Sequence, residues 1–175
     1  LTGSPSTVSA HPALKWSPSV YGDYFVWADD RNGVGNRDVF LYDFALGVET
    51  QLTSDTKAQY APVIHGNRVV YIDERNGNED IYMYDIATGI ETPIVTNGAA
   101  QISPAIYGDI IAWLDYRNGS YPDVYMYDIS TGTESAVTSR SAHYSPSFSG
   151  GEYVSIYDDK IVWFDYHTGN ADVHM

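Results

Sequence analysis

Residues 17–50 read SPSVYGDYFVWADDRNGVGNRDVFLYDFALGVET, and this stretch decides the fold because the chain repeats it. The same order of Ser-Pro, Gly-Asp, Trp-x-Asp-x-Arg-Asn-Gly, Tyr-Asp and Gly-x-Glu returns, with small changes, from residues 61 and 103. A fourth copy starts at Ser145-Pro146 and continues through Trp163, Asp165 and Asp172, with His167-Thr168 in place of Arg-Asn, up to Met175. A fixed period of about 42 residues is typical of a stacked or radial array, in which one unit cannot bury its own apolar faces. Features that every copy shares are therefore expected to be scaffold first.

Within a copy, the apolar residues come in short runs of strand-forming side chains. Tyr24–Ala28 and Val39–Tyr42 are rich in aromatic and β-branched residues, and they are apolar on both faces, so both sides of these strands should be covered. The turn-forming pairs Gly22-Asp23 and Asn32-Gly33 separate the runs, and a more polar run, Val48–Leu52, follows. Each copy thus predicts four antiparallel strands: a short one after the proline, two buried ones and a polar outer one.

Four-stranded sheets at this period predict an all-β fold, a β-propeller built of four-stranded antiparallel blades. The chain holds about four blades as one propeller region, and it could form part of a larger ring. We place the blades at about 17–53, 61–96, 103–138 and 145–175, the last incomplete, with residues 1–16 as an outer-strand stub and linker. Pairing of the N-terminal residues with the last blade, a second chain, or further blades of a longer chain would close the ring.

The repeated pattern, from Ser-Pro through Asp-x-Arg-Asn-Gly to Gly-x-Glu, resembles the TolB-like, or WD40-like, β-propeller repeat. It is most similar to the variant found in bacterial and archaeal cell-surface proteins, and the resemblance extends from Ser17 over nearly the whole chain. Proteins with this repeat include surface adhesion modules, periplasmic TolB-type proteins and the propeller domains of peptidases. The resemblance therefore implies an extracellular, cell-surface or periplasmic location.

Composition narrows the classes of partner. The formal net charge of −14 opposes binding to nucleic acid or to anionic membrane surfaces. No apolar run approaches the ~18 residues that span a bilayer, so we expect no membrane insertion. The chain contains no cysteine, which excludes disulfides and thiol catalysis.

One cluster invites a metal interpretation. Oxygen ligands at Asp29, Asn32, Asn36 and Asp38 surround a glycine turn, as calcium prefers. An arginine lies among them, however, and the pattern returns in other copies. We favour a structural role in which the aspartate accepts turn amide hydrogens and Arg31 pairs with a neighbouring aspartate. The sequence therefore predicts no cofactor and no metal, with calcium as the alternative.

Other candidate groups give no sign of catalysis. The aromatic residues Trp27, Tyr71, Trp113 and Trp163 share one repeat position, where they would pack adjacent blades or, alternatively, stack sugars. The histidines at 11, 65, 143, 167 and 174 fall at unrelated repeat positions without metal spacing, and no nucleophile or phosphate-binding motif occurs.

Binding residues are expected where the copies differ, because function commonly lies on variable loops over a regular scaffold. Copy four has extra residues around Ser149–Tyr153, and the inter-blade segments Ser54–Tyr60, Asn97–Ile102 and Ser139–Tyr144 should line one end of the ring. The candidate binding residues are Ser149, Glu152, Tyr153, Tyr60 and Tyr144.

These observations predict a non-enzymatic extracellular or cell-surface interaction or structural module. Its partner would be a protein or glycan ligand, and self-association could complete the ring. The alternatives are a propeller domain of a larger enzyme, such as a peptidase or polysaccharide lyase, and a carbohydrate-binding propeller lectin.

Overall fold

The computed structural model describes residues 7–139, 153–165 and 172–175, which form four antiparallel sheets. The first contains β1 (Lys15–Tyr21), β2 (Tyr24–Asp29), β3 (Asp38–Asp43) and β4 (Val48–Gln51), and the second contains β5 (Gln59–His65), β6 (Arg68–Asp73), β7 (Asp80–Asp85) and β8 (Ile90–Val95). The third contains β9 (Gln101–Tyr107), β10 (Ile110–Asp115), β11 (Asp123–Asp128) and β12 (Thr133–Ala136), and the fourth contains β13 (Val154–Tyr157), β14 (Lys160–Asp165) and β15 (Asp172–His174). Strands pair in chain order within each sheet. The described residues include no helix that could cross a membrane.

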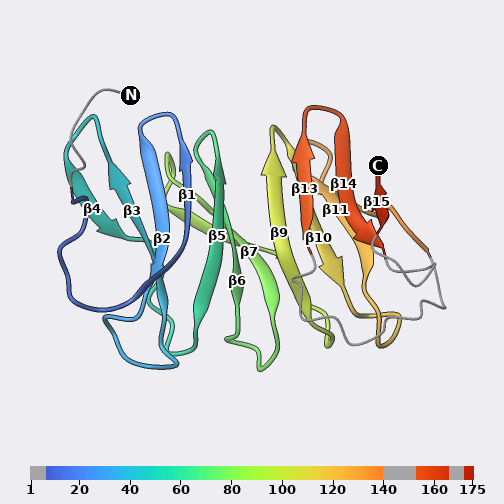
Figure 1. Ribbon diagram of the computed structural model, residues 1–175, viewed down its shortest axis with the longest axis horizontal. Helices are drawn as coiled ribbons and strands as arrows, with labels where there is room; N and C mark the ends of the chain where they lie inside the picture. Colours follow the sequence, from blue (N-terminus) through green and yellow to red (C-terminus); the bar gives the residue numbers. More distant parts are fainter. Residues whose placement is uncertain (1–6, 140–152, 166–171) are drawn as a thin grey trace.

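The sheets stand side by side in chain order, with the first and the fourth at opposite ends of the array (Figure 1). Their apolar faces meet to form the core: Val26 and Leu41 of the first sheet pack with Val69 and Tyr71 of the second. Similar clusters join the second sheet to the third and the third to the fourth. The predicted all-β fold with about four propeller-like blades is confirmed, because the sheets stand in sequence and neighbouring sheets bury apolar faces against each other.

The first strand of each sheet lies at the inner side of the array, and in the first three sheets the fourth strand lies at the outer side. β1, β5, β9 and β13 contact one another in sequence, so they line the region where the sheets converge. β4 and β12 are exposed along their whole length. This arrangement matches the predicted polar outer strand.

The inner strands are longer than the predicted short strand after the proline. Each of β1, β5 and β9 spans seven residues and begins ahead of its proline. The pairing register shifts at the proline, and the residue before it has a positive φ of 48° at Ser17, 51° at Ala61 and 53° at Ser103. A β-bulge leaves one residue out of the ladder, so the strand tolerates a proline, which cannot donate a hydrogen bond, and then continues.

Candidate functional site

The aspartate of the proposed calcium cluster is saturated by N–H donors. Asp29 is fully buried, and its carboxylate accepts hydrogen bonds from the Arg31 amide at 3.0 Å, from Arg31 Nη2 at 2.7 Å and from Trp27 Nε1 at 3.1 Å. Burial alone would raise the pKa of Asp29, but the hydrogen bonds from Arg31 and Trp27 outweigh it and lower the pKa to about 2. The carboxylate is therefore ionised and already balanced by a guanidinium.

The other residues of that cluster serve the same turn. Asn32 Nδ2 donates to Asp38 Oδ2 at 2.6 Å, and Asn36 Nδ2 lies 3.5 Å from the Asn32 carbonyl. Within the described ranges, no group of three or more His, Asp or Glu residues is arranged to hold a metal ion. The geometry supports the structural interpretation of these residues.

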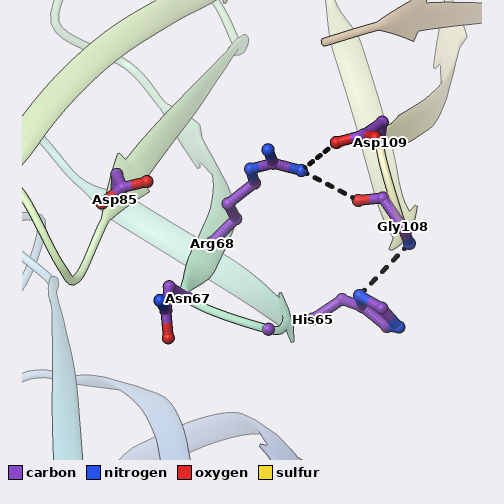
Figure 2. A pocket seen from close by; sticks show the side chains of 7 residues that line it. His65, Asn67, Arg68, Asp85, Gly108 and Asp109 are labelled. Carbon is purple, nitrogen blue, oxygen red and sulfur yellow. Dashed lines mark hydrogen bonds and ion pairs between the residues drawn. The ribbon is translucent and has the colours of Figure 1, made fainter. Parts of the chain in front are cut away.

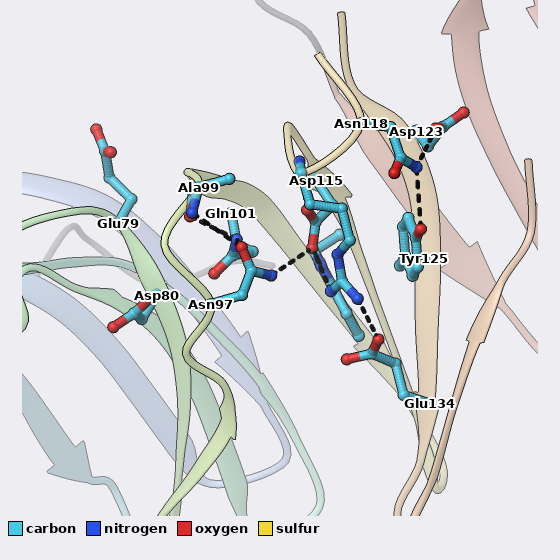
Figure 3. A network of polar contacts seen from close by, with 12 residues as sticks. Glu79, Asp80, Asn97, Ala99, Gln101, Asp115, Asn118, Asp123, Tyr125 and Glu134 are labelled. Carbon is cyan, nitrogen blue, oxygen red and sulfur yellow. Dashed lines mark hydrogen bonds and ion pairs between the residues drawn. The ribbon is translucent and has the colours of Figure 1, made fainter. Parts of the chain in front are cut away.

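Arg31 also bonds across the sheet, and this contact was not predicted. Arg31 Nη1 lies 2.6 Å from Glu49 Oε1 on β4 of the same sheet, and the guanidinium carbon lies 3.9 Å from the centroid of the Phe40 ring on β3. We call this unit of aspartate, arginine, glutamate and aromatic ring the turn clamp. The clamp recurs in the second sheet as Asp73, Arg75, Glu91 and Tyr82. In the third sheet it consists of Asp115, Arg117, Glu134 and Tyr125, and Figure 3 labels Asp115, Glu134 and Tyr125.

The turn clamp explains why Gly-x-Glu closes the first three copies. The glutamate of that motif reaches back to the arginine of its own copy, so the repeated Arg and Glu were the available sequence signal. Because all members of a clamp lie in one sheet and pair their charges with one another, we interpret the clamp as scaffold.

The repeated tryptophan position is buried. Tyr71 and Trp113 lie in the core between sheets, and Trp163 stacks on His174 with ring centroids 5.9 Å apart. Trp27 is also buried, but it lies on the side of the first sheet away from the second, stacked on Phe25 and Phe40 of its own sheet. Packing between sheets, the favoured prediction, is confirmed for Tyr71 and Trp113.

The predicted binding residues are only partly described. Ser149, Glu152 and Tyr144 lie outside the described residues. Tyr153 is exposed directly ahead of β13. Tyr60 is half-buried, with the Arg37 guanidinium 5.8 Å from its ring, and burial together with nearby Glu74 raises its pKa. Tyr60 is therefore a packing residue in this structure.

A row of aromatic side chains crosses all four sheets where each inner strand ends. Tyr21, His65, Tyr107 and Tyr157 are the last residues of β1, β5, β9 and β13. Their ring centroids are 4.5, 4.6 and 4.9 Å apart along the row, and neighbouring rings are tilted by 48°, 49° and 54°. We call this row the aromatic ladder. Its terminal members remain open to solvent, with Tyr21 43% and Tyr157 72% exposed.

The sequence carried a signal for this ladder. Each copy has an aromatic side chain directly before the pair that turns the first strand into the second, as in Tyr21-Gly22 and Tyr107-Gly108. In copy two the residue is His65, which occupies the same repeat position as Tyr21 and Tyr107. The five histidines share no repeat position with one another, so their spacing does not indicate this equivalence.

Polar contacts hold the middle of the ladder. His65 Nδ1 accepts a hydrogen bond from the Gly108 amide at 3.2 Å, which places the proton of a neutral ring on Nε2. Arg68 Nη1 lies 3.1 Å from the Gly108 carbonyl oxygen and 2.5 Å from Asp109 Oδ1 (Figure 2). These bonds join the second sheet to the third beside a hollow of about 300 Å³ that Asn67 and Asp85 also line.

The surroundings of the ladder are acidic. We call this the hairpin end, because the turns that follow the inner strands lie here. Its aspartates include Asp23, Asp43, Asp85, Asp109, Asp158 and Asp159. Arg68 and Lys160 are cations at this end, and each is paired with an aspartate. Desolvation, together with nearby Tyr157 and Asp158, raises the pKa of Tyr107.

Comparison with known proteins identifies the fold. No protein-family model matches the chain, and its sequence matches no curated protein. TolB of Acinetobacter baumannii is similar in structure, with a TM-score of 0.63 at 22% identity over 90% of this chain and 41% of that one. A putative TolB of Agrobacterium tumefaciens gives 0.61 at 19% identity over 78% of this chain and 53% of that one. The chain is built of TolB-like β-propeller blades.

The blades also resemble part of an enzyme. A puromycin-hydrolysing peptidase of Mycobacterium tuberculosis has a TM-score of 0.67 at 14% identity, over 96% of this chain and 29% of that one. This chain spans about half the length of the TolB chains that it matches. At these identities the likeness concerns the fold alone.

Proposed function

We propose that this β-propeller region is a non-enzymatic interaction module of an extracellular, cell-surface or periplasmic protein, and that its hairpin end binds a protein partner. The observation that carries the proposal is the aromatic ladder, a continuous row of rings across all four sheets with solvent-exposed tyrosines at both ends. Tyrosine suits interfaces because it buries a large apolar ring and keeps a hydroxyl for hydrogen bonding.

The ladder is also preorganised. The bonds of His65 and Arg68 to Gly108 fix the spacing of the central sheets, so binding would not have to order these side chains first. The carboxylates of the hairpin end set up a negative field, which favours a partner with complementary basic groups.

A glycan partner is less well supported at this end. A sugar stacks on the free face of an aromatic ring, whereas His65 and Tyr107 each have rings packed on both sides. Only the outward faces of Tyr21 and Tyr157 remain for such stacking. A glycan array probed with the purified protein would separate a lectin from a protein-binding module.

A propeller domain of a larger enzyme is the second candidate function. The structural likeness to part of a puromycin-hydrolysing peptidase favours it. In that case a catalytic segment would be encoded elsewhere in the parent gene, and the purified region would show no hydrolysis of its own.

Binding of labelled protein to envelope preparations from the source organism tests the proposal. Replacing Tyr21 and Tyr157 together with alanine should weaken binding about tenfold or more, since loss of an interface hot spot costs about 2 kcal/mol. Val34 and Val137 supply the control, because both are exposed apolar side chains at the end of the sheets opposite the ladder. Equal binding by wild type and the Tyr21→Ala/Tyr157→Ala variant would contradict the proposed site.

A further inference from the structure

The fourth sheet has an uncovered face whose equivalents are buried in the other sheets. We call the face of a sheet that packs on the next sheet in the chain its forward face, and the opposite face its rear face. Phe164 and Val173 are paired neighbours on the forward face of the fourth sheet and are 46% and 70% exposed. The equivalent pair in the first sheet, Ala28 and Val39, is completely buried. This exposed face therefore has the composition of a core.

The first sheet has an incompletely filled rear face. Trp16, Pro18, Phe25 and Trp27 line a hollow of about 340 Å³ there, together with Lys15 and with Val8 and Ser9 of the segment before β1. The lining is largely apolar. The first sheet stands at the left end of the array in Figure 1.

The repeat shows what fills such a hollow. In the second sheet the residues equivalent to Phe25 and Trp27 are Val69 and Tyr71, and apolar side chains from the forward face of the first sheet pack on them. The same kind of contact joins the second sheet to the third and the third to the fourth. A forward face of another blade is thus the occupant that matches the rear face of the first sheet.

We infer that two copies of this chain associate head to tail, with the fourth sheet of each covering the first sheet of the other. The first and fourth sheets of one chain lie at opposite ends of the array, so the described residues of one chain do not bring these two faces together (Figure 1). Two copies in this arrangement cover both faces in each chain, because a head-to-tail contact that closes gives a finite ring. The ring would have about eight blades, within the usual range of four to eight.

This inference concerns the outer faces of the first and fourth sheets and is independent of the aromatic ladder. A self-associating ring could lack any partner at the hairpin end, and a monomer could still bind one. The two proposals therefore fail separately.

Sedimentation velocity of the 175-residue chain at about 10 µM tests the inference. We expect a species of twice the 19.4 kDa chain mass, unchanged by added salt because the contact is apolar. Phe164→Lys on the forward face and Val20→Lys on the rear face should each give a monomer, while the exposed outer-strand control Ile90→Lys should remain a dimer. Val20 is exposed and pairs with Phe25, and its equivalents Ile64 and Ile106 pack on the preceding sheet. Circular dichroism shows whether each variant is folded.

Mixing the variants identifies the mode of association. Phe164→Lys retains an intact rear face and Val20→Lys an intact forward face, so an equimolar mixture should recover a dimer that neither forms alone. A Val20→Lys variant that dimerises by itself would show fourth-sheet-to-fourth-sheet pairing and overturn the head-to-tail arrangement. A wild-type monomer at this concentration, or a dimer insensitive to Phe164→Lys, would overturn the inference as a whole.

Discussion

Replacing Asp73 with alanine would remove the central acceptor of a turn clamp. The Asp73 carboxylate is fully buried and accepts hydrogen bonds from the Arg75 amide at 2.8 Å and from Arg75 Nη2 at 2.5 Å. In the variant, Arg75 would keep its 2.6 Å contact with Glu91 and its position 4.3 Å over the Tyr82 ring. The turn amide and half of the guanidinium would lose their partner.

The expected loss follows from how far water can replace that partner. A buried donor left unsatisfied costs about 1–3 kcal/mol, and breaking a fully buried ion pair costs about 3–5 kcal/mol. The Arg75 side chain is 26% exposed, so water solvates part of the orphaned charge. We therefore expect Asp73→Ala to lower the free energy of unfolding by about 2–3 kcal/mol, or the melting temperature by about 4–12 °C for a chain of this size.

Thermal unfolding followed by circular dichroism measures this difference. Asp85→Ala is the matched control, because Asp85 accepts only local hydrogen bonds from Thr88 in a more exposed turn and should cost less than about 1 kcal/mol. Excess EDTA should leave the wild-type melting temperature unchanged. The clamp interpretation fails if EDTA lowers that temperature by several degrees and calcium restores it, or if Asp73→Ala melts like the wild type.

Further predictions concern single residues of the scaffold and of the ladder. The pKa of Asp29 is lowered from 3.8 to about 2, so its stabilisation should be complete above about pH 4 and disappear as the pH falls through about 2; acid unfolding monitored by tryptophan fluorescence should show this, and Asp29→Asn should lose it. Asp158 has a φ of 56° where Gly108 has 57°, so Asp158→Gly should raise the free energy of unfolding by about 0.5–1 kcal/mol; a lower urea midpoint would contradict this. Tyr107→Ala removes the ring between His65 and Tyr157 and should cost about 1–3 kcal/mol, and a double-mutant cycle with Tyr157→Ala should reveal a coupling of about 0.5–1.5 kcal/mol.

The sequence was sufficient to predict the strands that are marked by a local pattern of apolar residues between turns. Tyr24–Ala28 and Val39–Tyr42 were predicted as buried strands and lie within β2 and β3, because period-two apolar runs between glycine turns have few other solutions. The proline bulge escaped prediction, since a proline normally argues against the middle of a strand and only the pairing register shows that the strand continues past Pro62.

The candidate site was beyond prediction for a different reason. The contact of His65 with Tyr107 joins residues of different sheets, and its distance depends on how closely the sheets converge at their inner strands. Pattern analysis identifies which positions are equivalent, but it does not give the spacing between sheets. Variable loops were therefore preferred as binding sites, although an equivalent position in every copy formed the continuous aromatic surface.

The turn clamp has an evolutionary consequence. Arg31 and its partners Asp29, Glu49 and Phe40 all belong to one sheet, whereas the contacts between sheets are mostly apolar. A duplicated gene segment encoding one blade would bring a complete set of buried charges with their counter-charges already in place. A new blade would then need only apolar faces of suitable shape on either side. Such a lineage can gain or lose blades by unequal recombination without first inventing compensating charges, so neighbouring family members should differ readily in blade number.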